Sequence, residues 1–148
     1  MVSPERVVDP GGRDGCRAPL PWTRHAGHGW GPDPWLPFPP DAADRSAEAL
    51  RADPTSILHL YRRLLTARRA SPALQMGDLE LLDAGPGGLA WRRRAHADER
   101  TVVVAFGAEP VSVDLPGIVE VASDGRGEDE PFSGTLDPDT AVLLRPLP

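Results

Sequence analysis

The sequence predicts an α+β chain in which an irregular segment and an amphipathic helix precede a small antiparallel β-sandwich. Three observations lead to this fold class. Prolines are dense before residue 41, and proline is excluded from helix interiors and central strands. Apolar residues then recur every three or four positions between residues 53 and 75, which is a helical period. Beyond residue 78, short β-leaning runs alternate with turn signals and no helix intervenes, a pattern typical of antiparallel sandwiches.

The first element, residues 1–40, is predicted to be an ordered loop. The stretch "PWTRHAGHGWGPDPWLPFPP" contains three of the four tryptophans, Trp22, Trp30 and Trp35. A disordered linker would be poor in aromatic residues. The tryptophans therefore predict a loop that packs against a larger body, which the rest of the chain does not obviously supply.

The second element is the helix in "DPTSILHLYRRLLTARRASPAL". Asp53 and Pro54 are suited to its start, as a cap and a residue with a pre-set φ, and Pro72 is expected to end it. A shorter helix is predicted at residues 44–51. The apolar residues recur at helical spacing and predict the packed face; they are Ile57, Leu58, Leu60, Tyr61, Leu64 and Leu65. The arginines are predicted to lie largely on the other sides; they are Arg62, Arg63 and Arg69.

The remaining elements are six short strands. They are predicted in "LELLDA", "GLAWRRRA", "RTVVVAFG", "VSVDL", "IVEVAS" and "AVLLRPL". About 70 residues are few for a sandwich of typically ~100, so we expect this part to lean on the preceding helix. The acidic "DGRGEDE" is interpreted as a solvated loop, because it lacks the alternating ligands and closing glutamate of a calcium loop.

Composition excludes several classes of protein. A net charge of −6 over 148 residues gives no general attraction to nucleic acid or to an anionic membrane. The single cysteine, Cys16, excludes an internal disulfide and suits a reducing compartment. No apolar run approaches the ~20 residues that span a bilayer, and "MVSPERVVDP" does not have the apolar core of a signal peptide. We expect a soluble cytoplasmic protein without nucleic-acid or membrane partners.

No cofactor, metal or catalytic residue is assigned from the residues alone. Cys16, His25 and His28 are suitable zinc ligands in type, but His59 and His96 lie in other elements and no paired cysteines occur, so ordinary loop residues are the favoured interpretation. No motif places a base beside Cys16 to make it a nucleophile. Phosphate-binding glycine loops are absent.

Carboxylates do not form a recognisable pair, which glycosidase chemistry would need. The acids Asp9, Asp14, Asp33 and Asp41 all lie in polar or proline-rich contexts. The stretch with Arg13, Asp14 and Arg17 is of more interest, because an arginine fork clamps a carboxylate at two points. Such a loop either braces itself or turns one arginine toward a polar ligand.

The order of these stretches resembles one family. "GRDGCRAPLPW" is similar to the R-D-x-x-R-x-P-M/L-x-W segment of α-glucosidases in the α-amylase superfamily, glycoside hydrolase family 13. "HAGHGW…PWLP", the long helical stretch above, "GLAWRRR", "TVVVAFGAEPVSVDLP" and "LDPDTAVLLRP" then resemble successive parts of the same enzymes. The resemblance covers nearly all of residues 11–148. His25 stands where asparagine is usual and Leu20 where methionine is common, and the stretch between Asp9 and Gly12 is shorter than in relatives.

The resemblance implies a C-terminal portion of such an enzyme. Residues 1–76 would be the last loop and helix of a (β/α)₈ barrel, and residues 77–148 the C-terminal β-sandwich domain. The family's catalytic carboxylates lie on earlier strands, so the chain would act on α-glucosides only within a full barrel, and whether it is an enzyme by itself is left open. Arg17 matches an arginine that approaches the substrate, and Asp14 would orient the loop.

Two other hypotheses remain. The chain could be a stand-alone interaction or glycan-binding module that docks on a partner, such as a separate barrel chain. It could also be a small β domain with a disordered N-terminal third. Apolar surface left uncovered by a missing barrel predicts self-association.

Overall fold

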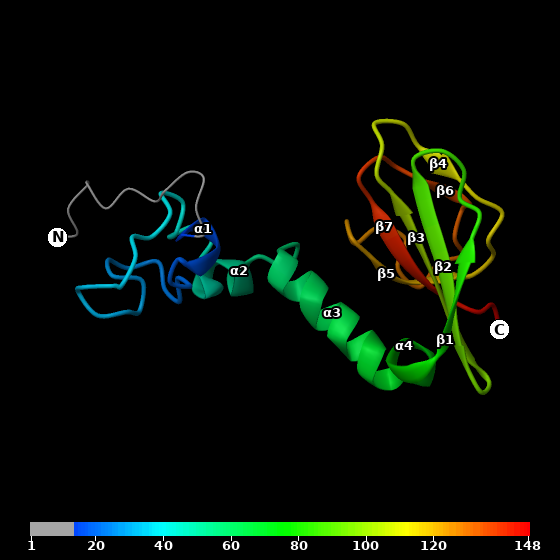
Figure 1. Ribbon diagram of the computed structural model, residues 1–148, viewed down its shortest axis with the longest axis horizontal. Helices are drawn as coiled ribbons and strands as arrows, with labels where there is room; N and C mark the ends of the chain where they lie inside the picture. The colour runs from blue at the N-terminus through cyan, green and yellow to red at the C-terminus, as the bar shows by residue number, and fades with distance from the viewer. Residues whose placement is uncertain (1–13) are drawn as a thin grey trace. The chain divides into compact units, whose positions relative to one another are not determined.

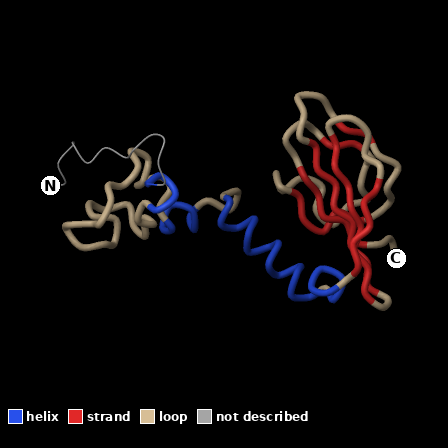
Figure 2. Tube along the Cα trace, viewed as in Figure 1, coloured by secondary structure: helices blue, strands red, loops and turns tan. Residues whose placement is uncertain are grey.

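The computed structural model describes residues 14–148, and the chain divides into two compact units, Met1–His59 and Leu60–Pro148. Helices precede a set of antiparallel strands (Figure 1, Figure 2), which confirms the predicted α+β class. The helices are α1 (Asp14–Arg17), α2 (Ala47–Ala52), α3 (Ile57–Ala70) and α4 (Pro72–Met76). The strands are β1 (Asp78–Leu82), β2 (Gly88–Ala95), β3 (Asp98–Ala105), β4 (Val111–Ser112), β5 (Ile118–Ala122), β6 (Thr135–Leu136) and β7 (Ala141–Arg145).

The first unit consists of turns tied to one short helix. Between residues 18 and 45 the chain has neither helix nor strand, as the proline density predicts. Ser46 caps α2 by accepting a hydrogen bond from the Ala49 amide. The free amides of Ala47 and Glu48 at the start of α2 donate to the carbonyls of Pro21 and Trp22, at 2.9 and 3.0 Å. The tryptophan-rich segment is therefore anchored on the N-terminal end of α2.

The helical region differs from the prediction at both ends. Residues 53–56 form a turn in which the Asp53 carboxylate accepts hydrogen bonds from the amide and hydroxyl of Thr55, so α3 begins only at Ile57. Pro72 does not follow a single long helix; it opens α4, with Ser71 as the cap. Proline fits a first helical turn because its missing amide would have no partner there. The shorter helix predicted at residues 44–51 is α2, which starts later, at Ala47.

The strands form two antiparallel sheets, which fit the predicted sandwich. The larger sheet has the order β1-β2-β3-β7-β5, and β4 pairs with β6 in the smaller one. The hairpin of β2 and β3 is paired over its full length, from Gly88↔Ala105 to Ala95↔Asp98. Five of the six predicted runs lie in strands of the large sheet and one contains β4; β6, only two residues long, was not predicted.

The main core lies between the two sheets. Ala90, Val103 and Ala105 of the large sheet meet Val111 of β4 and Leu136 of β6, and all five are buried. Alternation along each strand sends these side chains to one face of the sheet and their neighbours to the other. The core is therefore built by strands that are far apart in the sequence.

The opposite face of the large sheet packs against α3. Val121 of β5 and Leu143 of β7 are buried against Ala67. A register shift between Val119 and Val121 marks a β-bulge, which explains how Val119 faces the sheet-to-sheet core while Val121 faces the helix. The expectation that the β part leans on the preceding helix is confirmed within the second unit.

The helix buries a different face from the one predicted. Leu60 and Ala67 pack toward the sheet, and Arg63 lies with them, donating to the Ala122 carbonyl and pairing with Glu128 at 3.2 Å. The apolar residues Ile57, Tyr61, Leu64 and Leu65 are 40–62% exposed. At 100° per residue this exposed stripe lies about a quarter turn from the sheet-facing side. The prediction that Arg63 points away from the packed face is wrong.

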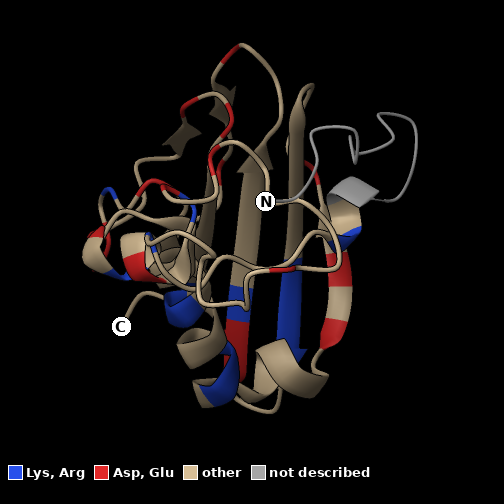
Figure 3. Ribbon diagram, turned by 90° about the vertical axis from the view of Figure 1, so that its left-hand side faces the viewer, with Lys and Arg blue, Asp and Glu red and all other residues tan. Residues whose placement is uncertain are grey.

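Charged side chains join α4 to the sheet near the β2–β3 turn. The Asp98 carboxylate accepts hydrogen bonds from the Ser71 hydroxyl and the Ala73 amide, and it pairs with Arg100, which also pairs with Glu120 of β5. Basic and acidic bands lie on neighbouring strands toward one end of the sheet (Figure 3).

The predicted division between residues 76 and 77 separates parts of an expected larger enzyme and stays a prediction.

Candidate functional site

Arg17 is the residue that the sequence assigns most directly to a ligand, and the structure places it at the end of α1. Its guanidinium carbon lies 6.0 Å from the centre of the Trp35 ring. This distance allows a cation–π contact, which holds a long side chain in one direction. The pairing with Trp35 was missed, because nothing in the spacing of residues 17 and 35 reveals it.

Asp14 is the first residue of α1, so it lies one turn before Arg17 on the same helix. The prediction that it orients the loop stays a prediction. Two of the charged residues weighed with it, Arg13 and Asp9, lie outside the described residues.

The histidine-containing stretch forms a compact turn. His28 has a positive φ of 49°, between Gly27 and Gly29, which are also left-handed. Its Nδ1 lies 3.0 Å from the Thr23 carbonyl and its ring meets Phe38 edge-on at 4.6 Å. The imidazole of His28 therefore has structural partners in the loop.

Two tryptophans fix this turn in place. The Trp30 indole donates to the Leu20 carbonyl at 2.7 Å. A Cβ at Gly29 would lie 2.9 Å from the Cβ of Trp22, so glycine is required where Trp22 crosses the turn. Trp22 packs on its own loop.

The zinc interpretation of Cys16, His25 and His28 gains no geometric support. Cys16 is a free, exposed thiol. Among residues 14–148, no three His, Cys, Asp or Glu side chains lie close enough together to hold a metal ion. In the same part of the chain, no helix is long and apolar enough to cross a membrane.

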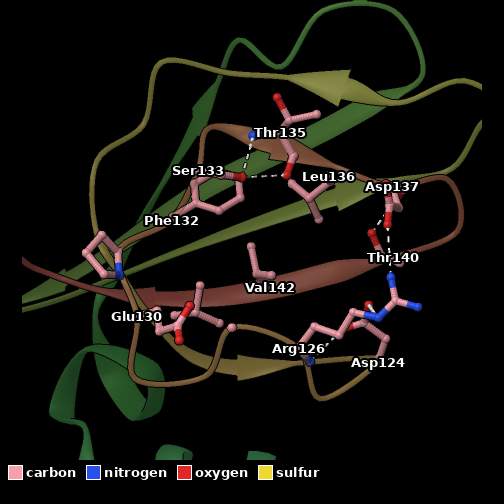
Figure 4. A pocket seen from close by; sticks show the side chains of 13 residues that line it. Asp124, Arg126, Glu130, Phe132, Ser133, Thr135, Leu136, Asp137, Thr140 and Val142 are labelled. Carbon is pink, nitrogen blue, oxygen red and sulfur yellow. Dashed lines mark hydrogen bonds and ion pairs between the residues drawn. The ribbon is translucent and has the colours of Figure 1, made fainter.

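A hollow of about 400 Å³ in the second unit was not predicted from the sequence (Figure 4). Its walls come from the β5–β6 connection, which contains the acidic "DGRGEDE", and from the β6–β7 connection. Buried Val119, Leu136 and Val142 form its floor. The acidic loop thus borders a cavity as well as the solvent.

Comparison with known proteins identifies enzymes that resemble this chain. The probable alpha-glucosidase of Rhizobium meliloti is 39% identical over 90 residues, which are 60% of this chain and 16% of that protein. The glucan 1,6-alpha-glucosidase of Streptococcus pneumoniae is 34% identical over 96 residues, 64% of this chain and 18% of that protein. The trehalose synthase/amylase TreS of Mycobacterium tuberculosis is 32% identical over 123 residues, 74% of this chain and 20% of that protein.

The fold comparison covers more of the chain. The trehalulose synthase MutB from Pseudomonas mesoacidophila MX-45 superposes with a TM-score of 0.78 at 27% identity, over 90% of this chain and 26% of MutB. Its F164L mutant, from crystals soaked with trehalulose, gives the same score at 25% identity. No protein-family model matches the chain. The chain spans a fifth or less of the length of these curated relatives.

Proposed function

Because this chain matches the C-terminal portion of α-glucosidase-type enzymes of glycoside hydrolase family 13 in sequence and fold, we propose that it contributes that portion to an enzyme acting on α-glucosides. The observation that carries the proposal is the superposition of 90% of this chain on 26% of MutB. The proposal includes the cytoplasmic location expected from the composition.

By itself the chain is proposed to be inactive. Barrel enzymes gather their chemistry at the C-terminal ends of parallel strands. Every strand pairing in the described part of the chain is antiparallel, so the described strands supply no such edge. The catalytic carboxylates would come from a barrel, and no catalytic residue is assigned to this chain.

Within a full barrel, Arg17 would contact the substrate. A guanidinium offers five donors in a rigid fork, which suits hydrogen bonds to sugar hydroxyls or to an active-site carboxylate. The contact with Trp35 would restrict the directions open to the side chain and so lower the entropy cost of that contact. Asp14, on the same short helix, would keep the loop in position.

A chimaera tests this function. Residues 11–148 would replace the matching C-terminal part of the Rhizobium meliloti enzyme, and release of 4-nitrophenol from 4-nitrophenyl α-glucoside would be measured. We expect activity from the chimaera and none from the chain alone. Arg17→Ala would remove a charge-assisted hydrogen bond that contributes ~1.5–3 kcal/mol. We therefore expect this substitution to lower the kcat/KM of the chimaera about 10- to 100-fold.

Arg45→Ala is the matched control, since Arg45 is an exposed arginine of the same unit that pairs with Asp41 in its own turn. This variant should retain kcat/KM. Hydrolysis by the purified chain would contradict the proposed inactivity. A folded chimaera without activity would contradict the proposed function.

A second candidate function is an interaction module that works without catalysis. The exposed apolar stripe of α3, with Tyr61 at 62% and Leu65 at 46% exposure, favours it. Such a stripe is suited to a protein partner, and a separate barrel chain is one partner that the resemblance suggests. Isothermal titration of the chain with an isolated barrel would show saturable binding if this candidate is right and flat heats if it is wrong.

A further inference from the structure

A second hollow, of about 520 Å³, lies next to the one in Figure 4. Both hollows are lined by Phe132 and Ser133, so they are neighbours on either side of these two residues. The second one is bordered by residues 112–116 and Gly134. We call the two neighbouring hollows together the Phe132 groove; their lining comes from β4, β5, β6, β7 and the connections between these strands.

The first hollow combines an apolar floor with a polar rim. Arg126 reaches from one wall toward the other, with its Nη1 3.3 Å from the Asp137 carboxylate and its Nε 3.6 Å from that of Asp124 (Figure 4). Thr140 donates to the Asp137 carbonyl at 2.6 Å, and the Arg126 amide donates to Asp124 at 3.0 Å. The hydrogen bonds of Thr140 and of the Arg126 amide shape the two walls, and the exposed side chains of Arg126 and Asp137 present donors and acceptors at the rim, as the polar groups of small-molecule sites do.

Phe132 is held between the hollows. Its backbone amide donates to the Gly117 carbonyl at 2.9 Å, and its half-buried ring packs against the core between the sheets. Figure 4 shows the ring across the hollow from Arg126. A fixed aromatic ring at the centre of a groove offers an apolar platform, and the second hollow adds the hydroxyl of Ser112 and the carboxylate of Asp114.

We propose that the Phe132 groove binds a short linear oligosaccharide. Carboxylates accept hydrogen bonds from the hydroxyl groups of a sugar, and the Arg126 guanidinium donates hydrogen bonds to the oxygen atoms of the sugar. The aromatic ring packs against the apolar face of the sugar. Asp124, Glu130 and Asp137 outnumber Arg126, which disfavours phosphorylated or acidic ligands. Two neighbouring hollows have room for more than one sugar unit, and the choice of α-linked glucose rests on the proposed function.

The test is a titration of the full ¹⁵N-labelled chain with maltotriose and with isomaltotriose, followed by amide chemical shifts. We expect saturable shifts confined to residues 112–116 and 124–140 for at least one of the two sugars. Phe132→Leu keeps an apolar side chain but removes the aromatic face, so it should weaken binding about 2- to 10-fold. Arg126→Gln should weaken it by a similar factor.

Arg94→Gln is the matched control, because Arg94 is an exposed arginine of the same unit that pairs with Glu99 and Glu80 away from the groove. It should leave the affinity unchanged. Absent or scattered shifts, affinity unaffected by both groove variants, or tighter binding of spermidine than of either sugar would overturn the proposal. Sugar binding with an inactive chimaera would remove the proposed function only, and an active chimaera without shifts in the groove would remove only this site.

Discussion

Asp98 is the residue through which α4 is fastened to the sheet. Burial by itself would raise the pKa of this carboxyl, but the hydrogen bonds from Ser71 and the Ala73 amide and the charge of Arg100 outweigh it and hold the pKa below its ordinary value. In Asp98→Asn, the charge is lost and the side-chain NH₂ group, itself a donor, would compete for a place beside the Ser71 hydroxyl and the Ala73 amide, which also donate. We expect a loss of about 1–3 kcal/mol in the free energy of unfolding at pH 7, measured by urea titration and circular dichroism.

The same group predicts how stability depends on pH. A folded pKa below the unfolded value of about 3.9 means that the carboxylate stabilises the fold above that pH, and that this contribution is lost as the pH falls through the folded pKa. The stability difference between wild type and Asp98→Asn should therefore shrink below about pH 4. Asp53→Asn is the control: Asp53 also accepts from a hydroxyl and an amide, but among residues 14–148 it has no arginine partner, so the loss on its substitution should be smaller. A difference that persists unchanged at pH 3 would contradict the assignment.

Single residues also show where sequence patterns mislead. The helical period separates apolar side chains from arginines, so it places Arg63 away from the packed face. In the structure Arg63 reaches the sheet because the Ala122 carbonyl and Glu128 offer partners there. Long side chains bury their stems and direct their charge to such partners. The contact between Arg17 and Trp35 was missed for a different reason: turns bring the two residues together, and a periodic pattern does not encode the geometry of turns.

At the scale of elements, the junction of α4 and β1 depends on Gly77. A Cβ at this position would lie 2.5 Å from the Ala73 carbonyl oxygen and 2.7 Å from that of Arg94. Both neighbours are backbone atoms, so the clash can be relieved only by moving α4 away from β2. We expect Gly77→Ala to lower the free energy of unfolding by about 1–3 kcal/mol, as overpacking does, in urea titrations.

Gly107 provides the matched control within the same unit. A Cβ there would have its nearest neighbour at 3.8 Å, and its φ is not in the left-handed region. Gly107→Ala should be neutral or stabilise by up to ~1 kcal/mol, since alanine restricts the unfolded chain. Equal losses for both variants would show that the junction does not depend on the close approach at Gly77.

Elements were predicted well where turn signals flank a β-leaning run, whereas the longer helical period of residues 53–75 misplaced both ends of the helix. The strand at residues 88–95 was placed at its observed bounds because eight residues pair along their whole length with β3. The two-residue strand β6 has too few positions to show alternation, and it exists because Leu136 fills the core beneath β4. The Phe132 groove could not be predicted either, because its walls come from connections whose residues meet only after the sheets have packed.

At the scale of the whole molecule, uncovered apolar surface is the property that links the candidate functions. Trp22, Trp30 and Trp35 of the first unit are 42–57% exposed, and Tyr61, Leu64 and Leu65 form a stripe on α3 in the second. Patches of this kind mark contact sites. A barrel would cover such surface in an enzyme, and another copy of the chain could cover it when the barrel is absent.

Self-association of the isolated chain follows from this surface. We expect the weight-average mass in sedimentation equilibrium to rise with protein concentration. Burial of one large apolar side chain contributes ~1.5–3 kcal/mol, so Leu65→Glu should weaken association about 10- to 100-fold. Thr66→Glu, at an exposed position on the other side of the same helix from the stripe, adds the same acidic group and should leave association unchanged.

These outcomes also separate the two uses of the stripe. If Leu65→Glu yields a monomer with unchanged circular dichroism and the same substitution lowers the activity or stability of the chimaera, one surface serves both contacts. If the chimaera is unaffected while association is lost, α3 contacts only other copies of the chain, and the barrel is joined through the tryptophan segment. A wild-type chain that stays monomeric at all concentrations would show that the exposed stripe is too small to hold a second copy, because the entropy lost on association exceeds what its burial returns.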